Sequence, residues 1–145
     1  MVRIVEEQVK ELIICAKNGD LVGNTYRASL EMAVLMSLLY FGPMKVTDAL
    51  NITEEALEKG TYLSKRKGQV RFRLPEEQQM LVRWYLASER KQGRCLKRAD
   101  ALLTKTKQNY DKLFKKIAST VGIEARLSDL YYAGLGRESK EMKRK

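Results

Sequence analysis

The residues best suited to chemistry in this sequence are basic side chains. The segment KRKGQVRFR holds five cations within nine residues, at Lys65, Arg66, Lys67, Arg71 and Arg73. Clustered Lys and Arg side chains bind the phosphate groups of nucleic acids, and an arginine fork fits a phosphate especially well. This segment therefore predicts a phosphate-binding ribbon.

A pair of tyrosines, Tyr131 and Tyr132, is the other chemically suggestive feature. A phenol can serve as a nucleophile toward phosphorus. However, Leu127, Leu130 and Tyr131 follow the i, i+3, i+4 spacing of one helix face. We therefore expect Tyr131 to pack in the core and Tyr132 to lie at the surface, without a catalytic role for either.

Several site classes are excluded by what the sequence lacks. It contains no histidine, which is the commonest general base and a frequent metal ligand. Its two cysteines, Cys15 and Cys95, are far apart, so neither a disulfide framework nor a Cys/His zinc site is expected. We predict a protein with no metal and no cofactor that is not an enzyme.

The overall charge indicates a polyanionic partner. The 145 residues include 28 Lys and Arg against 18 Asp and Glu, a formal net charge of +10. Double-stranded DNA is the partner that such a charge favours. No apolar run approaches the roughly 18 residues that a membrane span needs. We therefore expect a cytoplasmic protein with no membrane association.

The elements that must position these residues follow from periodicity and capping signals. Gly42-Pro43 ends an apolar helix, Thr53 caps a short one, and RKGQ is a hairpin turn. Trp84 is expected to be buried in its helix. The predicted helices cover 4–16, 27–41, 45–52, 53–59, 76–92, 106–122 and 125–135, and the hairpin covers 60–74. The predicted fold is mainly α with a small antiparallel hairpin, in one domain over 1–135. Gly134 and Gly136 should end the last helix, which leaves 136–145 as a flexible basic tail.

The order of these elements resembles the catalytic domain of tyrosine recombinases, the phage-integrase family. Three stretches carry the resemblance: YFGPMKVTDALNI, TYLSKRKGQVRFRLPEE and LLTKTKQNYDKLFKKIASTVGI. The resemblance places Lys45 where the family has an arginine and Asp48 where it has an acid. It also makes Lys65, or else Lys67, the counterpart of the catalytic lysine of the hairpin. Lys105, Lys107 and Arg126 should flank the same DNA groove.

The departures from the family pattern argue against its reaction. Ser128, Tyr131 and Tyr132 stand where the family has histidine, arginine and histidine, and the segment that brings the nucleophilic tyrosine has no counterpart. Lysine cannot reproduce the bidentate grip of arginine on a developing phosphorane charge. The resemblance therefore implies a degenerate active site that binds DNA without cutting it.

We accordingly expect a non-catalytic protein that contacts duplex DNA mainly through phosphates. It would serve a mobile element, plasmid or virus as a regulator or accessory factor, acting with a second copy or with another recombination or replication protein. Three alternatives stay open. One is a winged-helix regulator with recognition helix 54–63, although Glu54, Glu55 and Glu58 suit a DNA groove poorly. Another is a topoisomerase-like enzyme that uses Tyr131 or Tyr132. The third is a protein-interaction module with no nucleic-acid role.

Overall fold

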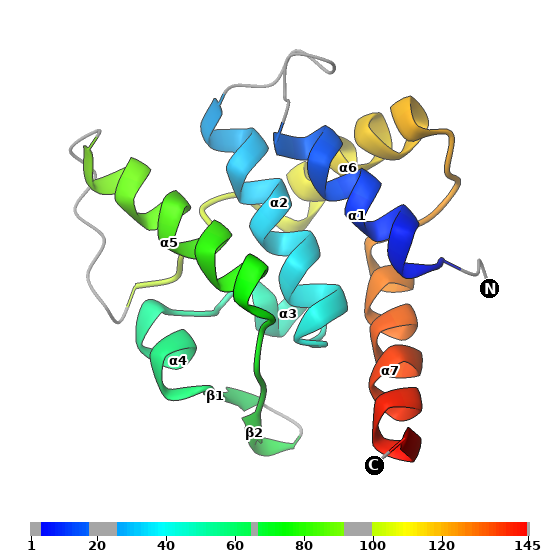
Figure 1. The fold of residues 1–145 in the computed structure, drawn as a ribbon. Helices are drawn as coiled ribbons and strands as arrows, with labels where there is room; N and C mark the ends of the chain where they lie inside the picture. Colours follow the sequence, from blue (N-terminus) through cyan, green and yellow to red (C-terminus); the bar gives the residue numbers. More distant parts are fainter. Residues whose placement is uncertain (1–3, 18–25, 65–66, 92–99, 145) are drawn as a thin grey trace.

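The computed structural model describes residues 4–17, 26–64, 67–91 and 100–144. In these ranges the chain forms seven helices and one two-stranded antiparallel sheet, as the sequence predicts (Figure 1). The helices are α1 (Glu6–Lys17), α2 (Tyr26–Phe41), α3 (Val46–Ala49), α4 (Glu54–Lys59), α5 (Glu76–Lys91), α6 (Lys107–Val121) and α7 (Leu127–Arg144), and the strands are β1 (Thr61–Ser64) and β2 (Gly68–Arg71). Within the described ranges, no helix combines the length and apolar character that crossing a bilayer requires.

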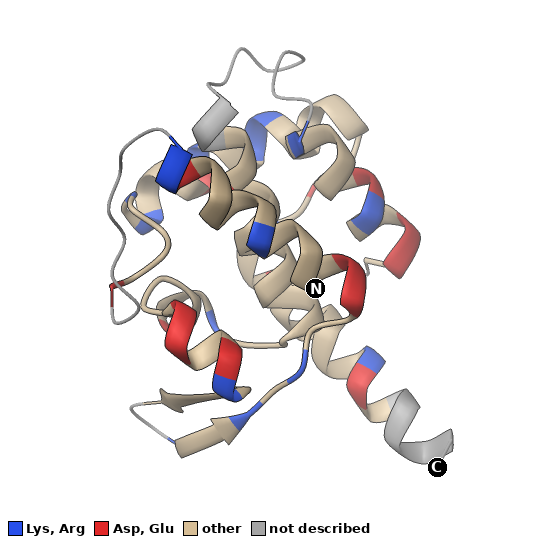
Figure 2. Ribbon diagram, turned by 60° about the vertical axis from the view of Figure 1, so that its left-hand side comes forward, with Lys and Arg blue, Asp and Glu red and all other residues tan. Residues whose placement is uncertain are grey.

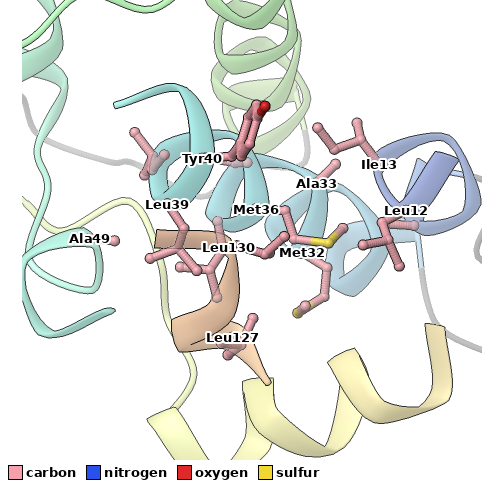
Figure 3. Packing of buried hydrophobic residues seen from close by; sticks show 14 of the residues in the cluster. Leu12, Ile13, Met32, Ala33, Met36, Leu39, Tyr40, Ala49, Leu127 and Leu130 are labelled. Atoms are coloured by element: carbon pink, nitrogen blue, oxygen red, sulfur yellow. The ribbon is translucent and has the colours of Figure 1, made fainter. Parts of the chain in front are cut away.

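Helix α2 is the centre of the fold. Every residue from Ser29 to Phe41 is buried, because α1, α5 and α7 pack around this helix (Figure 1). Figure 3 shows Leu12 of α1, Met36 of α2 and Leu130 of α7 in one apolar cluster. A helix that is apolar around its whole girth is stable only when other elements cover all its faces. The remaining helices are arranged to supply that cover.

The short elements after α2 form as their capping residues predict. The Thr53 side chain accepts a hydrogen bond of 3.1 Å from the Ala56 amide at the start of α4. Gly60 ends α4 in the left-handed conformation with φ of 70°, which costs glycine little. The chain then enters the hairpin, where Thr61 pairs with Arg71 and Ser64 pairs with Gly68.

Helix α6 matches the predicted helix 106–122 to within one residue at each end. The Thr106 side chain accepts from the Asn109 amide at 3.3 Å, and Gly122 ends the helix with φ of 83°. Tyr110, Phe114 and Ile117 are buried, as their spacing predicts. The basic residues of α6 consequently face solvent.

The predicted burial of Trp84 is wrong. Its side chain is 51% exposed, and the Lys17 ammonium lies 5.6 Å from the centre of its ring. Helix α5 instead buries a face that includes Val82, Tyr85 and Glu89. The apolar stripe predicted for α5 is wider than the part of the helix that packs against its neighbours, so Trp84 and Met80 at its edge remain exposed to solvent.

The predicted end of the last helix is also wrong, since α7 continues through Gly134 and Gly136 to Arg144. The expected tail, 136–145, therefore begins inside this helix. Gly134 lies where α7 crosses the end of α2, and a Cβ at this position would lie 2.3 Å from the Tyr40 carbonyl oxygen. This glycine permits close packing of two helices, whereas the sequence suggested a stop.

This crossing predicts opposite effects for two glycine substitutions in one helix. Gly134→Ala should lower the free energy of unfolding by about 1–3 kcal/mol, because backbone must move to admit the methyl group. Gly136→Ala meets no atom within 4 Å, so it should raise that free energy by up to about 1 kcal/mol through helix propensity. Urea unfolding of both variants measures the difference, and equal effects would contradict the close crossing.

Candidate nucleic-acid interface

A cleft of about 840 Å³ opens between α4, the connection after β2, α5 and α7. The end of α2 also contributes, through Phe41 and Gly42. Five basic and three acidic side chains line it, namely Lys59, Arg71, Arg73, Arg83, Arg137, Glu54, Glu58 and Glu138. Figure 2 shows basic positions along β2 and the following connection and on α5 and α7, with acidic positions on α4.

A second hollow of about 630 Å³ adjoins this cleft. The residues common to both are Arg73, Leu74, Gln79, Arg83 and Arg137. This shared set therefore contains three arginines and no acidic residue. The positive end of the cleft is the part where the two hollows meet.

The arginines of the cleft differ in the interactions that they already make within the protein. Nε of Arg137 donates to Glu6 Oε1 at 2.7 Å, and its guanidinium lies 5.1 Å from the centre of the Phe41 ring. Among the described residues, Arg71, Arg73 and Arg83 form no ion pair. These three forks are therefore open to an external anion.

The carboxylate of Glu54 is largely neutralised where α4 meets α5. Nη2 of Arg90 lies 2.9 Å from its Oε1 and 2.6 Å from its Oε2. On the same helix, Lys59 pairs with Glu55 at 2.6 Å. The Arg90 pair reduces the repulsion that an incoming phosphate would meet at this wall, whereas the Lys59 pair commits a lining cation to Glu55, which does not line the cleft.

The structure brings only part of the predicted basic set together. Arg71 and Arg73 line the cleft, and Lys67 is exposed at the hairpin turn. Lys65 and Arg66 lie outside the described residues.

The other four predicted cations do not line this cleft. Lys45 is the half-buried residue that precedes α3. Lys107 begins α6 and Arg126 precedes α7, both exposed. The Lys105 ammonium lies 3.8 Å from a carboxylate oxygen of the buried Glu31, so it is directed partly toward the core.

Two arginines of the cleft, Arg83 and Arg137, were missed by the sequence reasoning. Arg83 follows the buried Val82 and is exposed on the polar face of a correctly predicted helix. Arg137 had been assigned to the tail. A continuous 127–144 helix would have placed it one turn beyond Gly134, although nothing in the sequence marks that continuation.

The region that the recombinase resemblance would make catalytic contains phenols and two carboxylates. Burial, followed by the nearby charges of Asp48, Tyr131 and Glu138, raises the pKa of Tyr62 to about 12. Tyr131 is 8% exposed and Tyr132 is 52% exposed, with ring centres 5.2 Å apart. The predicted packing of Tyr131 and exposure of Tyr132 are thus confirmed.

A buried carboxylate, Glu31 of α2, is the centre of a hydrogen-bond network that joins α2 to α5 and α6. It is fully buried on α2, where Oε1 accepts from Thr104 Oγ1 at 2.6 Å and lies 3.2 Å from the Tyr85 hydroxyl. Its Oε2 accepts from the Tyr110 hydroxyl at 3.2 Å. A buried charge is tolerated only with such partners. Glu31 therefore ties α2 to α5, to α6 and to the connection between them.

The Tyr110 hydroxyl is saturated in this network. It accepts from the backbone amides of Thr104 and Lys105, each at 3.1 Å, while it donates to Glu31. Burial, followed by the negative charge of Glu31, raises the pKa of Tyr110 well above its ordinary value of 10.0. The network therefore requires the neutral phenol.

Comparisons of this chain with protein-family models, with curated proteins and with solved structures found no match.

The two perturbed phenols predict an alkaline loss of stability. The unfolded chain releases their protons near pH 10, whereas the folded chain holds the Tyr62 proton to about pH 12 and the Tyr110 proton above its ordinary pKa. The unfolded state then binds fewer protons, so the free energy of unfolding falls as the pH rises above 10. Denaturant unfolding between neutral pH and pH 11 should show this fall. Tyr110→Phe and Tyr62→Phe should each make it shallower, and an unchanged slope in both variants would refute the assignment.

Proposed function

We propose that this protein binds duplex DNA mainly through its phosphates and does not cleave it. The observation that carries the proposal is the cleft with three arginines that form no ion pair among the described residues. Each guanidinium presents paired N–H donors that match two phosphate oxygens. The net charge of +10 supports the same class of partner.

A degenerate tyrosine-recombinase scaffold is part of this proposal. The element order from α1 to α7 follows the order on which the resemblance rests. A lysine at position 45 and tyrosines at 131 and 132 would leave the site without the guanidinium groups that stabilise a phosphoryl transition state. The protein would then act in the cytoplasm as a DNA-bound regulator or accessory factor of a mobile element, plasmid or virus. Its partner would be a second copy or another recombination or replication protein.

A winged-helix regulator is the weaker alternative. The order α2, α3, α4 and hairpin fits it, but α4 has only six residues and carries Glu54 and Glu55 in its first turn. Carboxylates at this position would repel the phosphates on either side of a groove. Four of the five cations that line the cleft lie instead on β2, the connection after it, α5 and α7.

Neutralising the two hairpin arginines that line the cleft should weaken duplex binding. Arg71→Gln with Arg73→Gln should lower affinity for a random duplex and reduce the slope of log K against log salt by about two, because each lost phosphate contact removes about one unit. Fluorescence anisotropy at a series of salt concentrations measures both quantities.

A charge-matched variant separates this site from bulk charge. Lys115→Gln with Lys116→Gln removes two exposed cations of α6 that do not line the cleft. It should reduce affinity less than the arginine pair does. Equal losses in the two variants would mean that net charge alone drives binding, and no binding to any duplex at low salt would end the proposal.

The absence of cleavage is tested with supercoiled plasmid. After incubation with the protein, then with detergent and protease, the plasmid should stay supercoiled and no DNA should be linked to protein. Tyr132 is the more exposed phenol of the pair, so Tyr132→Phe is the variant to compare if any relaxation occurs. Relaxation that this substitution abolishes would establish a nucleophilic tyrosine and reverse this part of the proposal.

A further inference from the structure

The walls of the cleft differ from what a phosphate backbone alone would need. Apolar side chains share its lining with the arginines, and Leu57 and Phe72 among them are only half-buried. A phosphate gains nothing from an apolar wall, whereas the face of a nucleobase stacks on apolar and aromatic surfaces irrespective of its sequence. The cleft therefore has an apolar surface on which a nucleobase could stack, in addition to the arginines that could bind its phosphate.

The residues suited to bind a phosphate and those suited to contact a nucleobase belong to different parts of the cleft lining. The residues shared with the adjoining hollow include Arg73, Arg83 and Arg137 and no acidic residue, and the one acid of that hollow, Glu76, does not line the larger one. Leu57, Phe72 and Glu138 belong to the larger hollow only. A carboxylate such as that of Glu138 can accept a hydrogen bond from a base amino group. Phosphate and base are thus matched to different parts of the lining of one cleft.

The size of the cleft is also that of a site for a discrete ligand. Its volume of about 840 Å³ lies in the range of roughly 300–1,000 Å³ that small-molecule sites occupy. In an intact duplex the bases are stacked inside the helix, so a paired nucleotide cannot present its face to such a wall. Only a nucleotide outside a duplex satisfies both parts of the cleft lining.

We propose that the cleft holds an unpaired nucleotide of a DNA strand, with its phosphate between Arg73 and Arg83 and its base against Leu57 and Phe72. This inference deepens the proposed DNA binding and rests on it. It gives the protein a preference for duplexes that carry a single-stranded extension, such as those present at a nick, a fork or a processed end.

The test compares two labelled DNAs that differ in one feature. A blunt duplex and the same duplex with a single-stranded extension of about six nucleotides are titrated by fluorescence anisotropy at one salt concentration. The extension should raise affinity about tenfold, the effect of one well-stacked base. In the variant carrying Arg73→Gln and Arg83→Gln, the affinities for the two DNAs should come within about twofold of each other.

The control variant Lys115→Gln with Lys116→Gln should weaken both complexes together and keep their ratio. Circular dichroism verifies that both variants retain the helical fold. Deoxythymidine monophosphate, added as competitor, should displace the extension-bearing duplex down to the affinity of the blunt one.

Each way in which the proposal could fail gives a different binding result. If the blunt duplex binds but the extension brings no gain, the unpaired-nucleotide site is refuted while duplex binding stands. If the extension brings no gain but the mononucleotide binds in an arginine-dependent manner, a free nucleotide is the occupant and the strand is not. If neither DNA binds at low salt, the proposed function falls first.

Discussion

The fold depends on the burial of α2 from Ser29 to Phe41, and Glu31 is the only charged residue in that described stretch. Its carboxylate is accommodated because hydroxyl groups of Tyr85, Thr104 and Tyr110 converge on it from α5, the connection and α6. Removing one of these hydroxyls costs the buried carboxylate a hydrogen bond, which is destabilising. The network consequently specifies the relative placement of three helices that apolar packing alone would allow to slide.

This placement has consequences for the cleft. Helix α5 presents buried Val82 and Tyr85 to α2, and this orientation leaves Arg83 in solvent beside the cleft. At the other end of α2, Gly134 lets α7 approach the Tyr40 carbonyl and so brings Arg137 to the ring of Phe41. The central packing therefore decides which cations share the cleft. Three of them, Arg71, Arg73 and Arg83, have no ion pair among the described residues, and this leaves their charge available to a ligand.

Local signals in the sequence predicted the elements well where their causes are local. Thr53 accepts the expected capping bond, and the predicted range of α6 is found to within one residue at each end. Where the cause is a contact between distant segments, the prediction failed. Gly134 looked like a helix stop because its partner, the Tyr40 carbonyl, is 94 residues earlier in the chain. Trp84 was predicted to be buried because the sequence of α5 does not show how much of its apolar face α2 covers.

The candidate site divides along the same line. The sequence by itself determined the class of the protein, a mainly helical chain with a hairpin and an excess of cations, since composition and short-range periodicity are properties of the chain. It also identified Arg71 and Arg73, whose position follows from the hairpin. Only the tertiary structure decided that Arg83 and Arg137 join them while Lys105 is directed toward Glu31. The physical reason is that neighbouring residues in space decide whether a charged side chain forms an ion pair within the protein or can bind a ligand. The packing around α2 determines those neighbours.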